Sequence, residues 1–266
     1  MALIVNSNIA SLNAQRNLSK SQNDLGIALQ RLSSGLRVNS AKDDAAGLYV
    51  SEQFTRDIRG TNQAVRNSAD GISLAQTAEG ALGEITKNLQ RMREIAVQSA
   101  NGTITDRSGL QAEVTQLEAE NNRIISTTKF NGTPLLASGI DLSIQVGANN
   151  GDVVAITTPS GTTITAVSVA TSAGANAALT SLSTDIDTLS KTRATFGAVQ
   201  NRFEAVISNL QNYAENLTAA RSRIMDADFA EETAKLTRAQ ILQQAGTTIL
   251  AQANTIPQNA LSLLQG

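Results

Sequence analysis

The amino-acid sequence predicts a mainly α-helical protein in which both chain halves form one long antiparallel bundle, a coiled-coil rod with a small β-hairpin insertion. Apolar residues recur at alternating steps of three and four positions in both halves, which is the pattern of packed helices. Aromatic residues make up only 3% of the chain, which suits closely spaced helices better than a wide core of large rings. Between Lys129 and Lys191 there is no Lys or Arg, and the pattern changes.

The longest helical pattern lies in the C-terminal half. Its apolar residues step by three and four without a slip, at Phe196, Val199, Phe203, Val206, Leu210, Tyr213, Leu217, Ala220 and Ile224. The N-terminal half repeats this rhythm at Ala78, Leu82, Ile85, Leu89, Met92 and Ala96 and, after a break at Asn101-Gly102, at Leu110, Val114, Leu117 and Ile124. One antiparallel bundle is the simplest arrangement that buries three such stripes.

The middle of the chain, residues 139–182, predicts a small β element. Its first apolar residues alternate with polar ones, at Ile140, Leu142, Ile144 and Val146. The turn signal Asn150-Gly151 then precedes an apolar run at 153–156, which together predict a hairpin. Pro159-Ser160-Gly161 offers a second turn before the apolar segment 164–169.

Both chain ends are poor in charge. The first charged side chain is Arg16 and the last is Arg238, so the final 28 residues contain no ionisable side chain. A solvated helix normally carries charges on its outer face, and helices at these ends therefore need neighbours on several sides. We expect other copies of the chain to complete the packing in an open helical polymer. The apolar positions expected in its core are Leu18, Leu25, Leu29, Leu32, Leu36, Leu242, Ile249, Ile256, Leu263 and Leu264.

The composition argues against several classes of function. Lys and Arg number 21 against 23 acidic residues, with no basic block that would bind nucleic acid or an anionic membrane. The absence of Cys and His removes thiol and imidazole chemistry and most transition-metal sites, so we expect no cofactor. The apolar start, Met1–Val5, is too short for a secretory signal, and no apolar run is long enough to span a membrane.

Two adjacent carboxylates, Asp43 and Asp44, allow two interpretations. Acid/base catalysis is one, but neighbouring residues on a helix point about 100° apart and no His is present to partner them. Because they follow Asn39-Ser40, which is typical of a helix cap, we favour a capped linker. We therefore predict that the protein is not an enzyme.

Several segments resemble bacterial flagellin, namely Ile4–Leu18, Leu29–Leu36, Leu142–Ala148 and the stretch from Arg238 to Leu264. The resemblance implies a structural subunit that polymerises into the flagellar filament for swimming motility. It implies an extracellular location, reached through the flagellar type III export channel without a cleaved signal peptide. The implied partners are other copies of the chain, an export chaperone, the filament cap protein and the hook–filament junction proteins.

The resemblance also implies a division into domains. Residues 1–43 and 226–266 would form the terminal coiled-coil core domain, and 44–138 with 183–225 the helical rod domain. Residues 139–182 would be a hairpin insertion belonging to the rod domain, too short to include the large outer domains of longer flagellins.

A further implication is a surface recognised by a Toll-like receptor of the host, at Arg91, Ile95, Gln98 and Glu113. The first three share one helical face by their spacing, although flagellins usually have Leu in place of Ile95, and a solvated flank is the alternative. Gly197 costs its helix about 1 kcal/mol relative to Ala, which indicates either a close contact with another subunit or a poorly fixed helix start.

Three alternatives accompany this interpretation. The hook–filament junction subunit shares terminal helices with flagellin, but its terminal motifs are usually more divergent than those found here. A flagellin that carries a zinc protease would need a His-Glu-x-x-His helix, which a chain without His excludes. The Thr/Ser cluster at 157–163 could carry O-linked sugar or could simply form turns.

Overall fold

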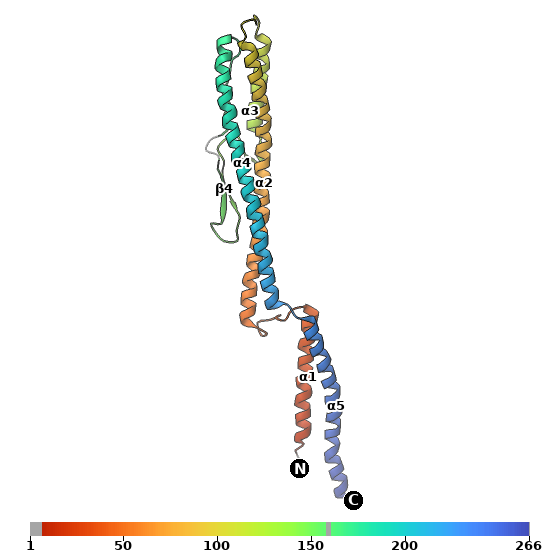
Figure 1. Ribbon diagram of the computed structural model, residues 1–266. Coiled ribbons are helices and arrows are strands. Elements are labelled where there is room, and N and C mark those ends of the chain that lie inside the picture. Colours follow the sequence, from red (N-terminus) through yellow and green to blue (C-terminus); the bar gives the residue numbers. More distant parts are fainter. Residues whose placement is uncertain (1–6, 158–160, 266) are drawn as a thin grey trace. The chain divides into compact units, whose positions relative to one another are not determined.

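The computed structural model describes residues 7–157 and 161–265, with side chains placed up to residue 255 (Figure 1). It confirms a mainly α-helical fold with small antiparallel β elements. The chain divides into two compact units, which we call unit 1 (Met1–Arg56 with Asn216–Gly266) and unit 2 (Asp57–Glu215). The residue limits given above for the three domain segments stay a prediction.

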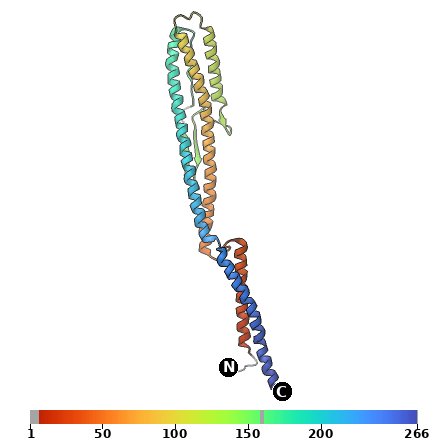
Figure 2. The ribbon, with the colours of Figure 1, turned by 45° about the vertical axis from the view of Figure 1, so that its right-hand side comes forward.

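Unit 1 is built on two helices, α1 (Ile9–Ser34) and α5 (Phe229–Gln265). They lie side by side and run antiparallel in both views (Figures 1 and 2). Asn8 caps α1, because its side-chain oxygen accepts a backbone N–H of the first turn at 3.0 Å. Asp228 does the same for α5, and two acidic residues follow in its first turn, where the helix dipole favours negative charge.

Backbone hydrogen bonds join the segment that follows α1 to the segment that precedes α5. Gly35 ends α1 with a φ of +71°, a left-handed conformation that suits glycine. Its carbonyl accepts the N–H of Ala227 at 3.0 Å, and Leu36 forms a β-bridge with Asp226. The backbone just after α1 is therefore hydrogen-bonded directly to the backbone just before α5.

Unit 2 is a bundle made of three helices. The helices are α2 (Ala45–Ala100), α3 (Ser108–Thr127) and α4 (Ser172–Met225). The N-terminal end of α2, up to Arg56, and the C-terminal end of α4, from Asn216, belong to unit 1. Glu79 of α2 accepts hydrogen bonds from Gln200 and Arg193 of α4, at 3.0 and 3.5 Å. The stripe predicted on α2 is confirmed, since all of its members are buried: Ala78, Leu82, Ile85, Leu89, Met92 and Ala96.

The stripe predicted on α4 is only partly correct. Phe196 and Phe203 are buried in the core of unit 2, whereas Tyr213 is exposed, because the apolar packing of the bundle thins out toward this end of the unit. Gly71 of α2 faces the ring of Phe203, and a Cβ built there would lie 2.8 Å from the ring carbons. The aromatic ring therefore fits against α2 because residue 71 has no side chain.

The predicted hairpin is confirmed. Strands β3 (Asp141–Gln145) and β4 (Val153–Thr157) pair in antiparallel register, with Leu142 opposite Ile156. A second hairpin, β1 (Lys129–Phe130) with β2 (Thr133–Pro134), was not predicted. Its two-residue turn, Asn131-Gly132, has positive φ at both positions and is the signal that would have found it.

The apolar segment that follows the hairpin, residues 164–169, is neither helix nor strand. Val167 and Val169 bury their side chains in the core of unit 2. The backbone N–H groups of residues 165, 167 and 169 donate hydrogen bonds to side chains instead of to another strand. The acceptors are Asp185 at 2.9 Å, Glu118 at 2.8 Å and Gln111 at 2.7 Å. Side chains from α3 and α4 thus replace a β ladder.

Candidate self-assembly interface

Most of the fully buried side chains on the inner face of the terminal helix pair are small. Those buried between α1 and α5 are Ser11, Ala14, Ser21, Ala28, Ala239 and Ala253. The side-chain amide of Asn8 donates to the carbonyl of Ala253 at 2.8 Å, and a Cβ at Gly246 would lie 3.3 Å from a methyl of Leu18. Small residues let the two helices approach closely, and leucines of α1 at positions 18, 25 and 32 are half-buried beside them.

The outer faces of the same helices carry further large apolar side chains. Eight of them are at least 46% exposed: Ile9, Leu12, Ile27, Leu29, Phe229, Ile241, Leu242 and Ile249. An ordinary solvated helix instead turns polar and charged residues to this side. Exposed apolar side chains gathered on one pair of helices are typical of a surface that meets another protein.

The predicted core positions therefore divide between the two faces. Leu18, Leu25 and Leu32 are half-buried within unit 1, and Leu36 is half-buried in the segment just after α1. The outer face contains Leu29, Leu242 and Ile249. The side chains of Ile256, Leu263 and Leu264 lie outside the described residues.

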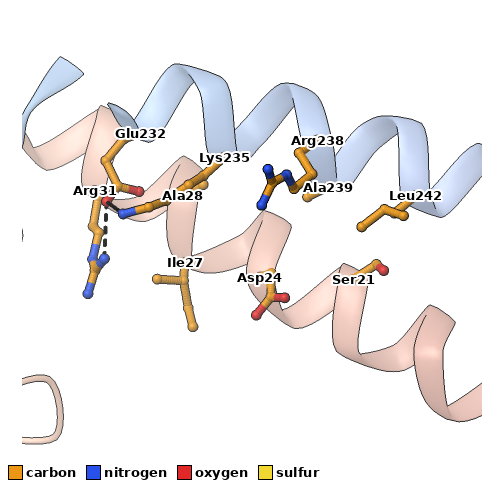
Figure 3. Close-up of a pocket in the computed structure, with 10 residues that line it drawn as sticks. All are labelled: Ser21, Asp24, Ile27, Ala28, Arg31, Glu232, Lys235, Arg238, Ala239 and Leu242. Atoms are coloured by element: carbon orange, nitrogen blue, oxygen red, sulfur yellow. Dashed lines mark hydrogen bonds and ion pairs between the residues drawn. The ribbon is translucent and has the colours of Figure 1, made fainter. Parts of the chain in front are cut away.

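One end of the helix pair forms a groove of about 360 Å³ that contains a charged cluster (Figure 3). Glu232 of α5 is only 4% exposed, and one of its oxygens lies 3.1 Å from Arg31 of α1 and 2.9 Å from Lys235. Burial by itself would raise the pKa of Glu232, but the hydrogen bonds from Lys235 and Arg31 together outweigh it and lower the pKa. The carboxylate is therefore ionised at neutral pH and joins α1 to α5.

The residues predicted for receptor recognition lie in unit 2, and the structure brings two of them together. Arg91 Nε donates to Glu113 Oε1 at 2.8 Å, which links the surfaces of α2 and α3, and Arg91 Nη1 lies 3.1 Å from Glu94. The hydrogen bond to Glu113, followed by that to Glu94, raises the pKa of Arg91. Gln98 is exposed on α2.

The prediction that Ile95 belongs to this surface is wrong. Its side chain is 1% exposed and packs in the core of unit 2 beside Met92 and Ala96. The spacing of four from Arg91 had suggested a shared outer face. However, Ile95 also lies three positions after Met92, and an apolar side chain at that position completes the buried stripe.

Two smaller predictions have local outcomes. A Cβ built at Gly197 meets nothing within 4 Å, so no contact within the described part of the chain requires glycine there. Asp44 accepts the N–H of Gly47 at 2.8 Å at the start of α2, while Asp43 accepts the N–H groups of Asn39 and Ser40. These carboxylates therefore hold the linker and the helix start.

Within residues 7–157 and 161–265, no group of three Asp or Glu residues is arranged to hold a metal ion. None of the helices in this described part is long and apolar enough to cross a membrane. The exposed apolar face of unit 1 is typical of a helical protein that packs against further protein chains.

Comparisons with known proteins give the family. The family model for the bacterial flagellin N-terminal helical region matches residues 5–140, and that for the C-terminal helical region matches 179–264. The flagellin of Halalkalibacterium halodurans is 45% identical over 272 residues, covering 99% of this chain and 100% of that one. The flagellin of Xenorhabdus nematophila is 43% identical, with both chains covered completely. A crystal structure of Bacillus cereus flagellin aligns with 59% of this chain and 94% of its own, at 35% identity and a TM-score of 0.49.

The chain belongs to the bacterial flagellin family. It is a structural subunit that polymerises into the extracellular filament of the bacterial flagellum.

Proposed function

We propose that the filament is held together in its core by the outer faces of α1 and α5. The observation that carries this proposal is the set of eight large apolar side chains on the outside of the two helices, each at least 46% exposed within one copy. Burying one exposed Leu, Ile or Phe side chain contributes about 1.5–3 kcal/mol. Contacts between copies would therefore gain apolar burial that one copy leaves unused.

Removal of residues 239–266 tests this proposal. The truncated chain keeps all of unit 2, so its helical circular dichroism should remain largely intact. It should also fail to form filaments visible by electron microscopy under conditions that assemble the full chain. Normal filaments from the truncated chain would refute the proposed role of α5.

We further propose that the subunit has no catalytic activity and leaves the cell through the flagellar type III export channel. The exposed apolar face needs cover before assembly, which supports an export chaperone on the uncharged segment after Arg238. The filament cap and the hook–filament junction proteins are the proposed partners at the two ends of the polymer. Measuring secretion from a strain that lacks the chaperone tests this route.

Recognition by a Toll-like receptor of the host is a second proposed role, at Arg91, Gln98 and Glu113. The supporting observation is the exposed ion pair between α2 and α3, in which Glu113 and Glu94 hold the guanidinium group. A planar multi-donor group held in place in this way is a good contact for a partner protein.

Gly197 also stays a proposed subunit contact, because the space above it is open within the described chain.

A further inference from the structure

Three Asn-Gly pairs occur in loops of unit 2, at Asn101-Gly102, Asn131-Gly132 and Asn150-Gly151. The assembly function uses none of them. In such a pair, the backbone nitrogen of Gly has no neighbouring side chain that hinders its approach to the Asn carboxamide. We propose that Asn150 is a site of spontaneous deamidation, and that the fold protects Asn101 and Asn131 from the same reaction.

The reaction needs only water as a co-reactant. The backbone nitrogen of Gly151 attacks Cγ of Asn150, so that an N–Cγ bond forms and the Cγ–Nδ2 bond breaks. Ammonia leaves with the amide proton of Gly151, and a five-membered cyclic imide remains. Water then opens the imide at either carbonyl carbon, which gives aspartate or isoaspartate at position 150.

The tip of the β3–β4 hairpin leaves both reacting groups accessible. Asn150 and Gly151 are exposed, and the carbonyl of Gly151, which belongs to the next peptide group, accepts the N–H of Val153 at 2.9 Å. Val146 donates its N–H to the carbonyl of Asp152 at 2.8 Å, and Asp152 donates to that of Asn149 at 3.3 Å. Within the described chain, no hydrogen bond holds the Asn150 carboxamide or the N–H of Gly151. The side chain and the following peptide group can therefore turn toward each other.

The loop after α2 holds Asn101 in place. Its side-chain oxygen accepts the N–H of Thr103 at 3.1 Å. Its carbonyl accepts Arg107 Nη2 at 3.1 Å and the N–H of Ile104 at 3.3 Å. Since the Asn101–Gly102 peptide group must rotate before its nitrogen can attack, these hydrogen bonds oppose ring closure.

The β1–β2 turn protects Asn131 in a different way. Asn131 has a φ of +47° and Gly132 a φ of +82°, and together they form a two-residue turn. The pairs Lys129–Pro134 and Phe130–Thr133 close the hairpin directly beside this turn. Swinging the peptide group of this turn would open the pairing of the short strands, whereas the pairing of β3 with β4 ends at Gln145 and Val153, farther from Asn150. Ring closure is therefore disfavoured at Asn131.

Deamidation at Asn150 would add a negative charge at the tip of the β3–β4 hairpin. Asp152 already lies two residues away, and Gly151 and Asp152 line an open groove together with Arg202 of α4. A new carboxylate at the hairpin tip would bring a second negative charge to the rim of this groove. The full-length chain would then slowly acquire a more acidic form.

Peptide mapping by mass spectrometry tests the proposal. The native full-length protein is incubated in mildly alkaline buffer, and the exchange of NH for O is followed at the three Asn residues. Synthetic peptides with aspartate or isoaspartate at position 150 identify the products. We expect conversion at Asn150 to be several-fold faster than at Asn101 or Asn131.

The same incubation of the chain unfolded in guanidinium is the control. Because all three Asn residues are followed by Gly, their rates should converge once the fold is removed. Native conversion at Asn101 or Asn131 as fast as at Asn150 would overturn the proposal. An unchanged spread of rates in the unfolded chain would also overturn it, since the protection would then not come from the fold.

Discussion

Arg31 Nη1 lies 3.1 Å from Glu232 Oε1 and joins α1 to α5 across 201 positions of the sequence. Glu232 is buried, and Lys235 approaches the same oxygen at 2.9 Å. This ion pair therefore ties the first turn of α5 to the last turns of α1 within one copy.

The pairing of α1 with α5 should weaken in acid. The pKa of Glu232 is lower in the folded pair than its ordinary value of 4.5, so its contribution is complete above that value. This contribution is lost as the pH falls through the folded pKa. Glu232→Gln should weaken the pairing at neutral pH by about 1 kcal/mol, since Lys235 is partly exposed. Hydrogen exchange of the α5 amides should show this difference at neutral pH and lose it in acid; equal exchange at neutral pH would contradict the assignment.

Gly71→Ala should destabilise unit 2. The added methyl would lie 2.8 Å from the Phe203 ring, and overpacking of this kind costs about 1–3 kcal/mol. Gly197→Ala is the matched control, because its methyl meets nothing within 4 Å and alanine favours the helix by up to about 1 kcal/mol. Thermal unfolding should therefore shift in opposite directions for the two variants. If Gly197→Ala also leaves filament assembly intact, Gly197 is not a subunit contact.

The sequence predicted those parts of the fold in which one period persists over many residues. The α2 stripe and the β3–β4 hairpin are examples, because a regular apolar pattern specifies both the element and its buried face. The segment 161–170 could not be predicted in the same way. Its backbone N–H groups bond to Gln111, Glu118 and Asp185, which are polar residues far away in the sequence.

The candidate site was predicted less completely than the fold. Runs of apolar residues without charge indicated that the terminal helices meet other copies, but not which face does so. The inner face includes half-buried leucines such as Leu18 as well as Ala28 and Ala239, so an apolar pattern alone does not separate it from the outer face. Ile95 was misplaced for a related reason, since a position between a polar face and a buried stripe is resolved only by the packing of neighbouring helices.

Receptor signalling by the monomer should fall when the exposed ion pair is removed. Arg91→Ala and Glu113→Ala change surface residues, so the melting transition of each variant should remain close to that of the unchanged chain. A cell-based assay of Toll-like receptor signalling measures the effect. Ile95→Ala is not a suitable test, because truncation of a buried Ile costs about 2–5 kcal/mol and perturbs the bundle itself. An undiminished response to the double variant of Arg91 and Glu113 would place recognition elsewhere.

The segment 161–170 should depend on its side-chain acceptors. Glu118→Ala would leave the Val167 N–H without its partner, at a cost of about 1–3 kcal/mol. Glu118→Gln keeps an acceptor oxygen and should recover most of this loss. Chemical denaturation of the three proteins measures the difference. Equal stability of the Ala and Gln variants would show that the hydrogen bond to Val167 contributes little.

Filament assembly by variants of one outward-facing residue is the most direct test of whether the outer faces of α1 and α5 hold the filament together. Leu242 is 51% exposed within one copy, so Leu242→Asp should leave the helical signal of the monomer unchanged. In the filament, it would place an unpaired charge in an apolar contact between copies, which is strongly unfavourable. Leu242→Met is the control, because it keeps the apolar character of the side chain. We expect filaments by electron microscopy for Leu242→Met and none for Leu242→Asp, whereas normal filaments from Leu242→Asp would show that the outer face of α5 does not pack between copies.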